Sequence, residues 1–91
     1  MARTFSSAYV GRGLRFNAVS PGPIETPIWS RPGSIPSEAV EGTKKAVAEG
    51  NPMKRYGTTD EITSAITFLL SSESTYILGA DLVVDGGVTQ L

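Results

Sequence analysis

The stretch NAVSPGPIETPIW, Asn17–Trp29, joins the end of a strand pattern to an abrupt proline-rich turn. The segment LRFNAVS, which begins at Leu14, is mostly apolar and bounded by glycine and proline, so it predicts a strand. Pro21 can end that strand because it gives no N–H to the ladder, and Gly22 lets the backbone approach a flat ring. Proline–glycine pairs also mark simple rigid turns. On the residues alone, both a stiff turn and a ligand-facing loop are open.

Length and composition define the class of protein. The chain has 91 residues, enough for one domain at most, and a chain of this size buries a thin core. Eight basic residues against nine acidic ones give a net charge of −1, which provides no basic surface for nucleic acid or an anionic membrane. The sequence has no cysteine and no histidine, so we expect no metal site. No apolar run could span a bilayer, and we expect a soluble cytoplasmic protein.

A first helix is expected at the start of the chain. Apolar residues recur at helical spacing from Ala2 to Tyr9, and Gly11 and Gly13 end the pattern. No capping residue or leading loop precedes this helix. We therefore expect the chain to begin part-way along a helix.

The most regular pattern begins at Thr58, which forms a capping box with Glu61 three residues later. It predicts a helix from about Thr59 to Ser71, with a single apolar stripe that we assign to the core. The residues of this stripe are Ile62, Ala65, Ile66, Leu69 and Leu70.

A weaker helix is predicted for SEAVEGTKKAVAEG, Ser37–Gly50, because it has few large apolar residues and Gly42 interrupts it. The proline-rich stretch before it, residues 21–36, is longer than the loops of compact domains usually are. We therefore interpret residues 23–50 as a lid segment.

A second buried strand is predicted from Ala80 to Val84, closed by a tight turn at Asp85-Gly86-Gly87 whose glycines are expected at positive φ. Because a helix separates the two strands, they are expected to be parallel with a right-handed crossover. Parallel sheets need further strands and cover on both faces. The fold class is therefore α/β, and the chain is expected to be the edge of a larger sheet whose unpaired strand favours association or incomplete folding.

Three ordered motifs carry a family resemblance: NAVSPGPIETP, NPMKRYGTTDEI and ITFLLSSESTYILGADLVVDGG. They resemble the C-terminal part of the short-chain dehydrogenase/reductase family over nearly the whole chain. The resemblance implies a single partial Rossmann-like domain over residues 1–91, with the last two strands of a doubly wound sheet and their flanking helices. It also implies a parent oxidoreductase that uses NAD or NADP and acts on an alcohol or ketone substrate.

The family's catalytic Tyr-x-x-x-Lys pair is absent from this chain. The residues four positions after the three tyrosines, Tyr9, Tyr56 and Tyr76, are Gly13, Asp60 and Ala80. The Gly-x-Gly at Gly11 precedes a strand and lacks a third glycine, so it does not match a cofactor-binding turn. We therefore assign no catalytic residue, and predict that the chain alone is inactive and binds a nicotinamide cofactor weakly or not at all.

The resemblance assigns binding roles to the loop after the first strand. The implied cofactor-binding residues, at the nicotinamide end, are Pro21, Gly22, Ile24 and Thr26. In this assignment the main chain of Ile24 forms hydrogen bonds with the carboxamide of the nicotinamide ring, and the Thr26 hydroxyl adds a further contact to it. Ile28 and Trp29 lie where the family covers its substrate. They form either an apolar pocket wall or a contact that packs the loop onto the body.

A second hypothesis makes the chain a non-catalytic interaction module. It would associate with itself or with a full-length relative through its strand edge and its tail, which in the family lies near a subunit interface. Codons upstream of Met1 that encode Tyr-x-x-x-Lys would favour a simple truncation. A ribosome-binding site directly before Met1 would favour a separate product.

Overall fold

The computed structural model describes residues 1–27 and 36–91. These residues form three helices and two strands, with short 3-10 turns at Val10–Arg12 and Ser72–Ser74. The elements are α1 (Ala2–Tyr9), β1 (Ala18–Pro21), α2 (Ser37–Glu49), α3 (Thr59–Leu70) and β2 (Asp81–Val84). All three predicted helices are confirmed, and α3 ends one residue before the predicted boundary.

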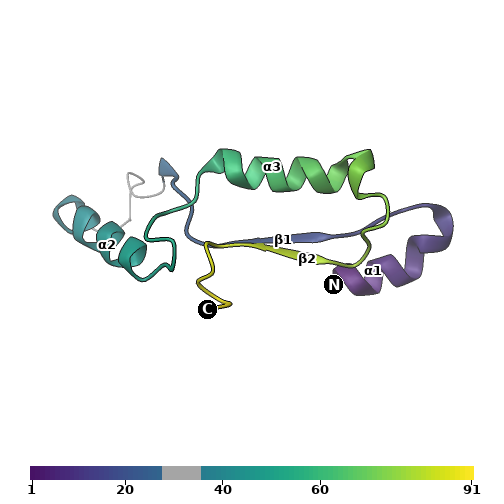
Figure 1. Cartoon of the computed structure of the whole chain (residues 1–91), viewed down its shortest axis with the longest axis horizontal. Coiled ribbons are helices and arrows are strands. Elements are labelled where there is room, and N and C mark those ends of the chain that lie inside the picture. The colour runs from purple at the N-terminus through teal and green to yellow at the C-terminus, as the bar shows by residue number, and fades with distance from the viewer. Residues whose placement is uncertain (28–35) are drawn as a thin grey trace.

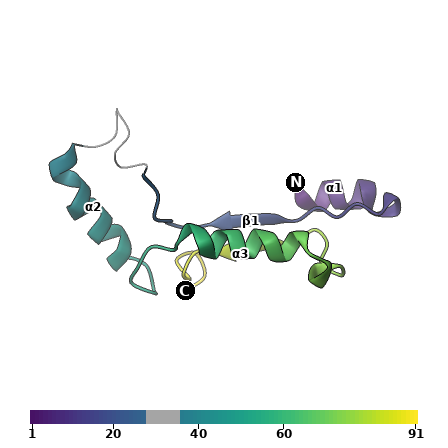
Figure 2. The same cartoon turned by 90° about the horizontal axis from the view of Figure 1, so that it is seen from above.

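The two strands pair in parallel, with Ala18 opposite Asp81 and Pro21 opposite Val84. Helix α3 runs along one face of this ribbon, α1 lies at the end where the strands begin, and α2 lies beyond the end where they stop (Figure 1). The same arrangement is visible from above, where α2 stands apart from the sheet (Figure 2). The expected α/β class and the parallel pairing are therefore confirmed.

The capping box of α3 forms as the sequence predicts. The hydroxyl of Thr58 accepts a hydrogen bond from the Glu61 N–H at 3.1 Å, and the Glu61 carboxylate accepts one from the Thr58 N–H at 2.8 Å. These bonds satisfy two N–H groups that have no partner within the helix. The start of α3 is therefore fixed at Thr59.

The first strand is shorter than predicted, because it covers Ala18–Pro21 and not residues 14–20. At the start of β1, the side chain of Asn17 makes hydrogen bonds that backbone groups would make in a longer strand. Its Oδ1 accepts from the Ala80 N–H at 2.9 Å, and its Nδ2 donates to the Ile77 carbonyl at 3.1 Å. A side chain that bonds backbone groups competes with regular pairing, and the strand begins only after it.

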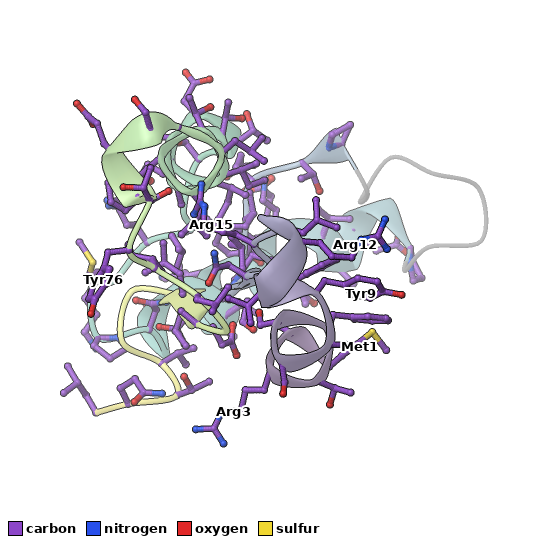
Figure 3. The ribbon with its side chains drawn as sticks, turned by 90° about the vertical axis from the view of Figure 1, so that its right-hand side faces the viewer. Met1, Arg3, Tyr9, Arg12, Arg15 and Tyr76 are labelled. Atoms are coloured by element: carbon purple, nitrogen blue, oxygen red, sulfur yellow. The ribbon has the colours of Figure 1, made fainter. Side chains whose placement is uncertain are left out.

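Aromatic and arginine contacts connect α1, the segment before β1 and the connection after α3. The Phe16 ring lies 5.3 Å from the Phe5 ring, centroid to centroid. Arg15 donates to the backbone carbonyls of Ser74, at 2.7 Å, and Ile77, at 3.3 Å. Figure 3 looks onto this end and shows Arg15 between α1 and α3, whereas Tyr76 projects outward. Arg15 therefore ties the segment before β1 to the connection after α3.

The predicted core is not closed. Among the described residues, no apolar side chain is fully buried, and the buried side chains are polar: Ser6, Asn51, Ser74 and Asp85. The α3 stripe that we assigned to the core is only half-buried at Ile62, while Leu70 is 80% exposed. The reason is that only a two-stranded ribbon lies against this helix.

The second strand differs from the prediction in the same way. We expected Ala80–Val84 to be a buried strand, but Leu82 and Val83 are exposed on its two faces. Strands of parallel sheets need cover on both faces, and here one face of the ribbon carries no helix over it (Figure 1). The strand pattern was correct, and the expected burial was wrong for this chain by itself.

The dimensions of the chain also show that it is less compact than a closed domain. Its radius of gyration is 16.7 Å and its extents are 53 × 30 × 21 Å, whereas a compact domain of this length has a radius of gyration of about 12 Å. Its accessible surface is 6621 Å², against about 5,100 Å² for a folded monomer of this mass. The chain is therefore more extended, and exposes more surface, than a compact monomer of its mass.

Candidate functional site

Three segments meet where the two parallel strands end: the loop after β1, the turn after β2, and the connector between α2 and α3. Ligands of open α/β sheets bind in this position, beyond the carboxyl ends of the strands. A hollow of about 320 Å³ lies among the three segments. Its lining includes Pro23, Ile24, Met53, Val84 and Gly86.

The loop after β1 is held by backbone hydrogen bonds to the connector. Gly57 donates its N–H to the Pro23 carbonyl at 2.9 Å and accepts from the Glu25 N–H at 2.8 Å. These two bonds make Ile24 and Gly57 an isolated parallel bridge. In such a bridge the N–H and C=O of the middle residue, Ile24, face the opposite side. Within the described part of the chain, neither of these Ile24 groups has a partner.

The structure gives Gly22 a packing role in addition to the one that the sequence suggested. A Cβ at this position would lie 2.5 Å from the Asp85 Cβ and 2.7 Å from its Cα. The Gly22 N–H also donates to the Val84 carbonyl at 3.0 Å. The absent side chain therefore makes room for the neighbouring strand end, and the ligand-facing role of Gly22 stays a prediction.

The structure brings only part of the predicted site to the hollow. Ile24 lines it. Pro21 is the last residue of β1 and pairs with Val84. It does not line the hollow, and affects it only by setting where the loop after β1 begins. Thr26 is half-buried two residues beyond Ile24 and is not part of the lining. The two predicted substrate residues, Ile28 and Trp29, lie outside the described residues and stay a prediction.

The turn after β2 is organised by the Asp85 carboxylate. It accepts hydrogen bonds from the Thr89 hydroxyl and from the backbone N–H groups of Gly87, at 2.8 Å, and Thr89, at 3.2 Å. The Thr89 hydroxyl first, and then these N–H groups, lower the pKa of Asp85. Gly86 and Gly87 have positive φ, as the turn pattern predicts. Asp85 is therefore a charged structural acceptor in this turn.

A charged pair lies beside the hollow. The Arg55 guanidinium binds the Glu61 carboxylate with both arms, at 2.8 and 2.9 Å. Arg55, followed by the Thr58 N–H, lowers the pKa of Glu61 from its ordinary 4.5 to about 2. Both side chains are about half exposed, so the pair orders the start of α3 more than it strengthens the fold.

Sequence reasoning missed the buried amide of Asn51, which lies between α2 and the turn after β2. It is 2% exposed and makes two backbone hydrogen bonds. The only sequence signal was the Asn-Pro pair, which marks a turn and does not indicate burial.

The described ranges contain neither a candidate metal centre nor a membrane-spanning helix. Neither range brings three or more acidic, cysteine or histidine side chains together as a metal centre would need. No helix in them is long and apolar enough to cross a bilayer.

Comparison with known proteins decides the family. A family model described as Enoyl-(Acyl carrier protein) reductase matches residues 1–89. The chain belongs to the short-chain dehydrogenase/reductase family. Its strands and helices match the C-terminal part of the Rossmann folds of this family.

Two characterised relatives of this dehydrogenase/reductase chain illustrate the coverage. Glucose 1-dehydrogenase of Gluconobacter oxydans is 47% identical over 89 residues, which are 98% of this chain and 32% of the relative. The 3-oxoacyl-[acyl-carrier-protein] reductase FabG of Thermotoga maritima is 36% identical over 88 residues, 97% of this chain and 33% of the relative. The chain thus spans about a third of the length of these relatives.

A solved structure gives the same result. A protein of Agrobacterium tumefaciens described as a 2-deoxy-D-gluconate 3-dehydrogenase, with bound NADP, superposes with a TM-score of 0.82 and 31% identity. The superposition covers 99% of this chain and 35% of the Agrobacterium protein. The fold expected from the resemblance is therefore confirmed.

Proposed function

We propose that this chain supplies the nicotinamide side of an NAD- or NADP-dependent oxidoreductase that acts on an alcohol or carbonyl group. Residues 1–91 would form a single partial domain, with residues 23–50 as its substrate loop and lid. The observation that carries the proposal is that Ile24, which lines the hollow at the strand ends, has an N–H and a C=O without a partner among the described residues. The likeness to a structure with bound NADP supports it.

A carboxamide is chemically suited to this edge of the loop. It carries one acceptor oxygen and an N–H donor, and the Ile24 main chain offers the complementary donor and acceptor. Thr26 would add its hydroxyl, while Pro21 and Gly22 shape the loop. The bound cofactor supplies the hydride chemistry, and this chain binds and orients its nicotinamide end.

The same proposal makes the chain inactive by itself. It has no Tyr-x-x-x-Lys pair and no glycine-rich turn leading into a helix after a strand. Anion affinity for a pyrophosphate normally comes from such a helix N-terminus. We therefore expect neither turnover nor tight cofactor binding without the other two thirds of the enzyme.

A chimera tests this function. Residues 1–91 would replace the matching third of the Gluconobacter glucose 1-dehydrogenase, and reduced nicotinamide would be followed by absorbance. We expect turnover of glucose, and none from this chain alone. A chimera that folds and binds cofactor but does not turn over would contradict the proposal.

Two changes then probe the nicotinamide contacts within the chimera. Thr26→Val should weaken cofactor binding about fivefold, as expected for a hydrogen bond worth ~1 kcal/mol. The matched control Thr63→Val, on the exposed side of α3, should leave it unchanged. A cofactor analogue with acetyl in place of the carboxamide loses its donor to the Ile24 carbonyl and should bind more weakly by a similar factor. Equal binding of analogue and cofactor would count against the Ile24 contact.

The exposed apolar surface favours a second candidate function, an association module. The chain exposes roughly 1,500 Å² more than a folded monomer of its mass, and a standard protein interface buries about 800 Å² on each partner. We propose pairing with a second copy or with a full-length relative. Light scattering after sizing chromatography tests this, and a monomer with slow amide exchange throughout the two strands would refute it.

A further inference from the structure

Asn51 is a polar residue that is only 2% exposed. Buried polar groups in folded proteins have hydrogen-bond partners. The Nδ2 of Asn51 donates to the Asp85 carbonyl at 2.9 Å, and its Oδ1 accepts from the Met53 N–H at 2.8 Å. One amide thus joins the connector after α2 to the turn after β2.

The surrounding backbone leaves this amide little freedom. A Cβ at Gly86, where φ is +66°, would collide with the Asn51 side chain. On the helix side, the Asn51 N–H donates to the Ala48 carbonyl at 3.1 Å, within the last turn of α2. Gly22, in the loop after β1, packs against the same Asp85. We call this loop, from Gly22 to Thr26, the nicotinamide loop after its proposed function. Helix α2, Asn51, the turn after β2 and the nicotinamide loop therefore form one continuous line of contacts.

Among the described residues, the other side-chain attachments of α2 are exposed. Lys44 pairs with Glu25 at 2.8 Å on the surface, and an exposed pair of this kind is worth about 0–1 kcal/mol. Lys54 donates to the Glu49 carbonyl at 2.8 Å, also at the surface. Helix α2 stands apart from the sheet, beyond the strand ends (Figure 2). The buried amide is therefore the attachment that water competes with least.

We infer that Asn51 is a positioning residue, whose side-chain amide fixes the end of lid helix α2 to the turn after β2 and so sets the lid relative to the nicotinamide loop. The inference rests on the proposed function where it concerns substrate. If α2 covers the substrate, loosening this anchor weakens substrate binding while the cofactor contacts at Ile24 persist.

The structure provides a matched control for this anchor. Asn17 makes the same pair of bonds at the opposite end of the sheet, from Nδ2 to the Ile77 carbonyl and from the Ala80 N–H to Oδ1. Asn51→Asp and Asn17→Asp each keep the accepting oxygen and remove the donor. The two variants therefore make the same chemical change, and only one of them lies at the lid.

The first test is amide hydrogen exchange in the full 91-residue chain. Asn51→Asp should speed exchange in α2 about tenfold while α3 stays within about twofold, because the Asp85 carbonyl loses its 2.9 Å bond from the Asn51 amide and keeps only the longer bond from the Val88 N–H, at 3.3 Å. Asn17→Asp should produce no selective change in α2. Equal acceleration of α2 and α3 in Asn51→Asp, or the same α2 response in Asn17→Asp, would overturn the inference.

The second test uses the chimera with glucose 1-dehydrogenase and separates this inference from the proposed function. Asn51→Asp should raise the KM for the sugar about tenfold, with kcat and the cofactor Kd within about twofold. An unchanged sugar KM, or a cofactor Kd that rises equally, would overturn the positioning role. If the unsubstituted chimera is inactive, the proposed function fails, and the exchange test still decides the role of Asn51.

Discussion

Gly22→Ala tests the close approach of the two strand ends, on which the whole site depends. The added methyl would lie 2.5 Å from the Asp85 Cβ and 2.7 Å from its Cα. Real side chains almost never come so close, and neither Asp85 atom is the free end of a flexible chain. The methyl can be accommodated only if the loop after β1 or the turn after β2 moves.

The size of the effect follows from this geometry. Adding a methylene-sized group to a packed position costs about 1–3 kcal/mol when the backbone must shift. The ratio of unfolded to folded chain should therefore rise roughly 5- to 150-fold. For a chain of this size, with a urea dependence of about 1 kcal/mol per M, the midpoint should fall by about 1 M or more.

Urea unfolding of the full chain, followed by helical circular dichroism, measures this change. Gly42→Ala is the matched control, because it adds the same methyl within α2 and meets nothing within 4 Å. It should stabilise the helix by up to ~1 kcal/mol, so the two glycine substitutions should have opposite signs. If Gly22→Ala unfolds at the same urea concentration as the unsubstituted chain, the strand ends do not approach as the structure shows.

Two further predictions concern α3. The Arg55–Glu61 pair lowers the pKa of Glu61 to about 2, so its contribution to stability is present above about pH 4.5 and is lost as the pH falls through about 2. Glu61→Gln should therefore be less stable than the unsubstituted chain at pH 7, and the gap should close towards pH 2; a constant gap across urea midpoints would contradict this. Thr58→Ala removes the N-cap and should cost about 1 kcal/mol, against little change for Thr63→Ala, and equal urea midpoints for these two variants would refute the cap.

Local sequence signals predicted the elements well. The capping box at Thr58 and Glu61 determined the start of α3, because both bonds lie within one helical turn. The glycines after β2 were correctly expected at positive φ, since a tight turn demands it. Such features depend on neighbours a few residues away and can therefore be predicted from the sequence.

Contacts between residues far apart in the chain could not be predicted in this way. The need for glycine at position 22 comes from Asp85, 63 residues later, and the burial of Asn51 comes from the same turn. Nothing around Gly22 or Asn51 in the sequence indicates these partners. Burial of α3 and β2 was overestimated because apolar patterning shows which face is meant to be covered and cannot show what covers it.

The central claim is that this chain holds the nicotinamide end of a cofactor whose affinity comes mainly from the rest of the enzyme. Calorimetric titration of NADP into the full chain and into the chimera, under one set of conditions, tests it most directly. We expect no binding tighter than about 1 mM, ~−4 kcal/mol, for the chain, and micromolar binding, ~−8 kcal/mol, for the chimera. Micromolar binding of NADP by the isolated chain would contradict the account.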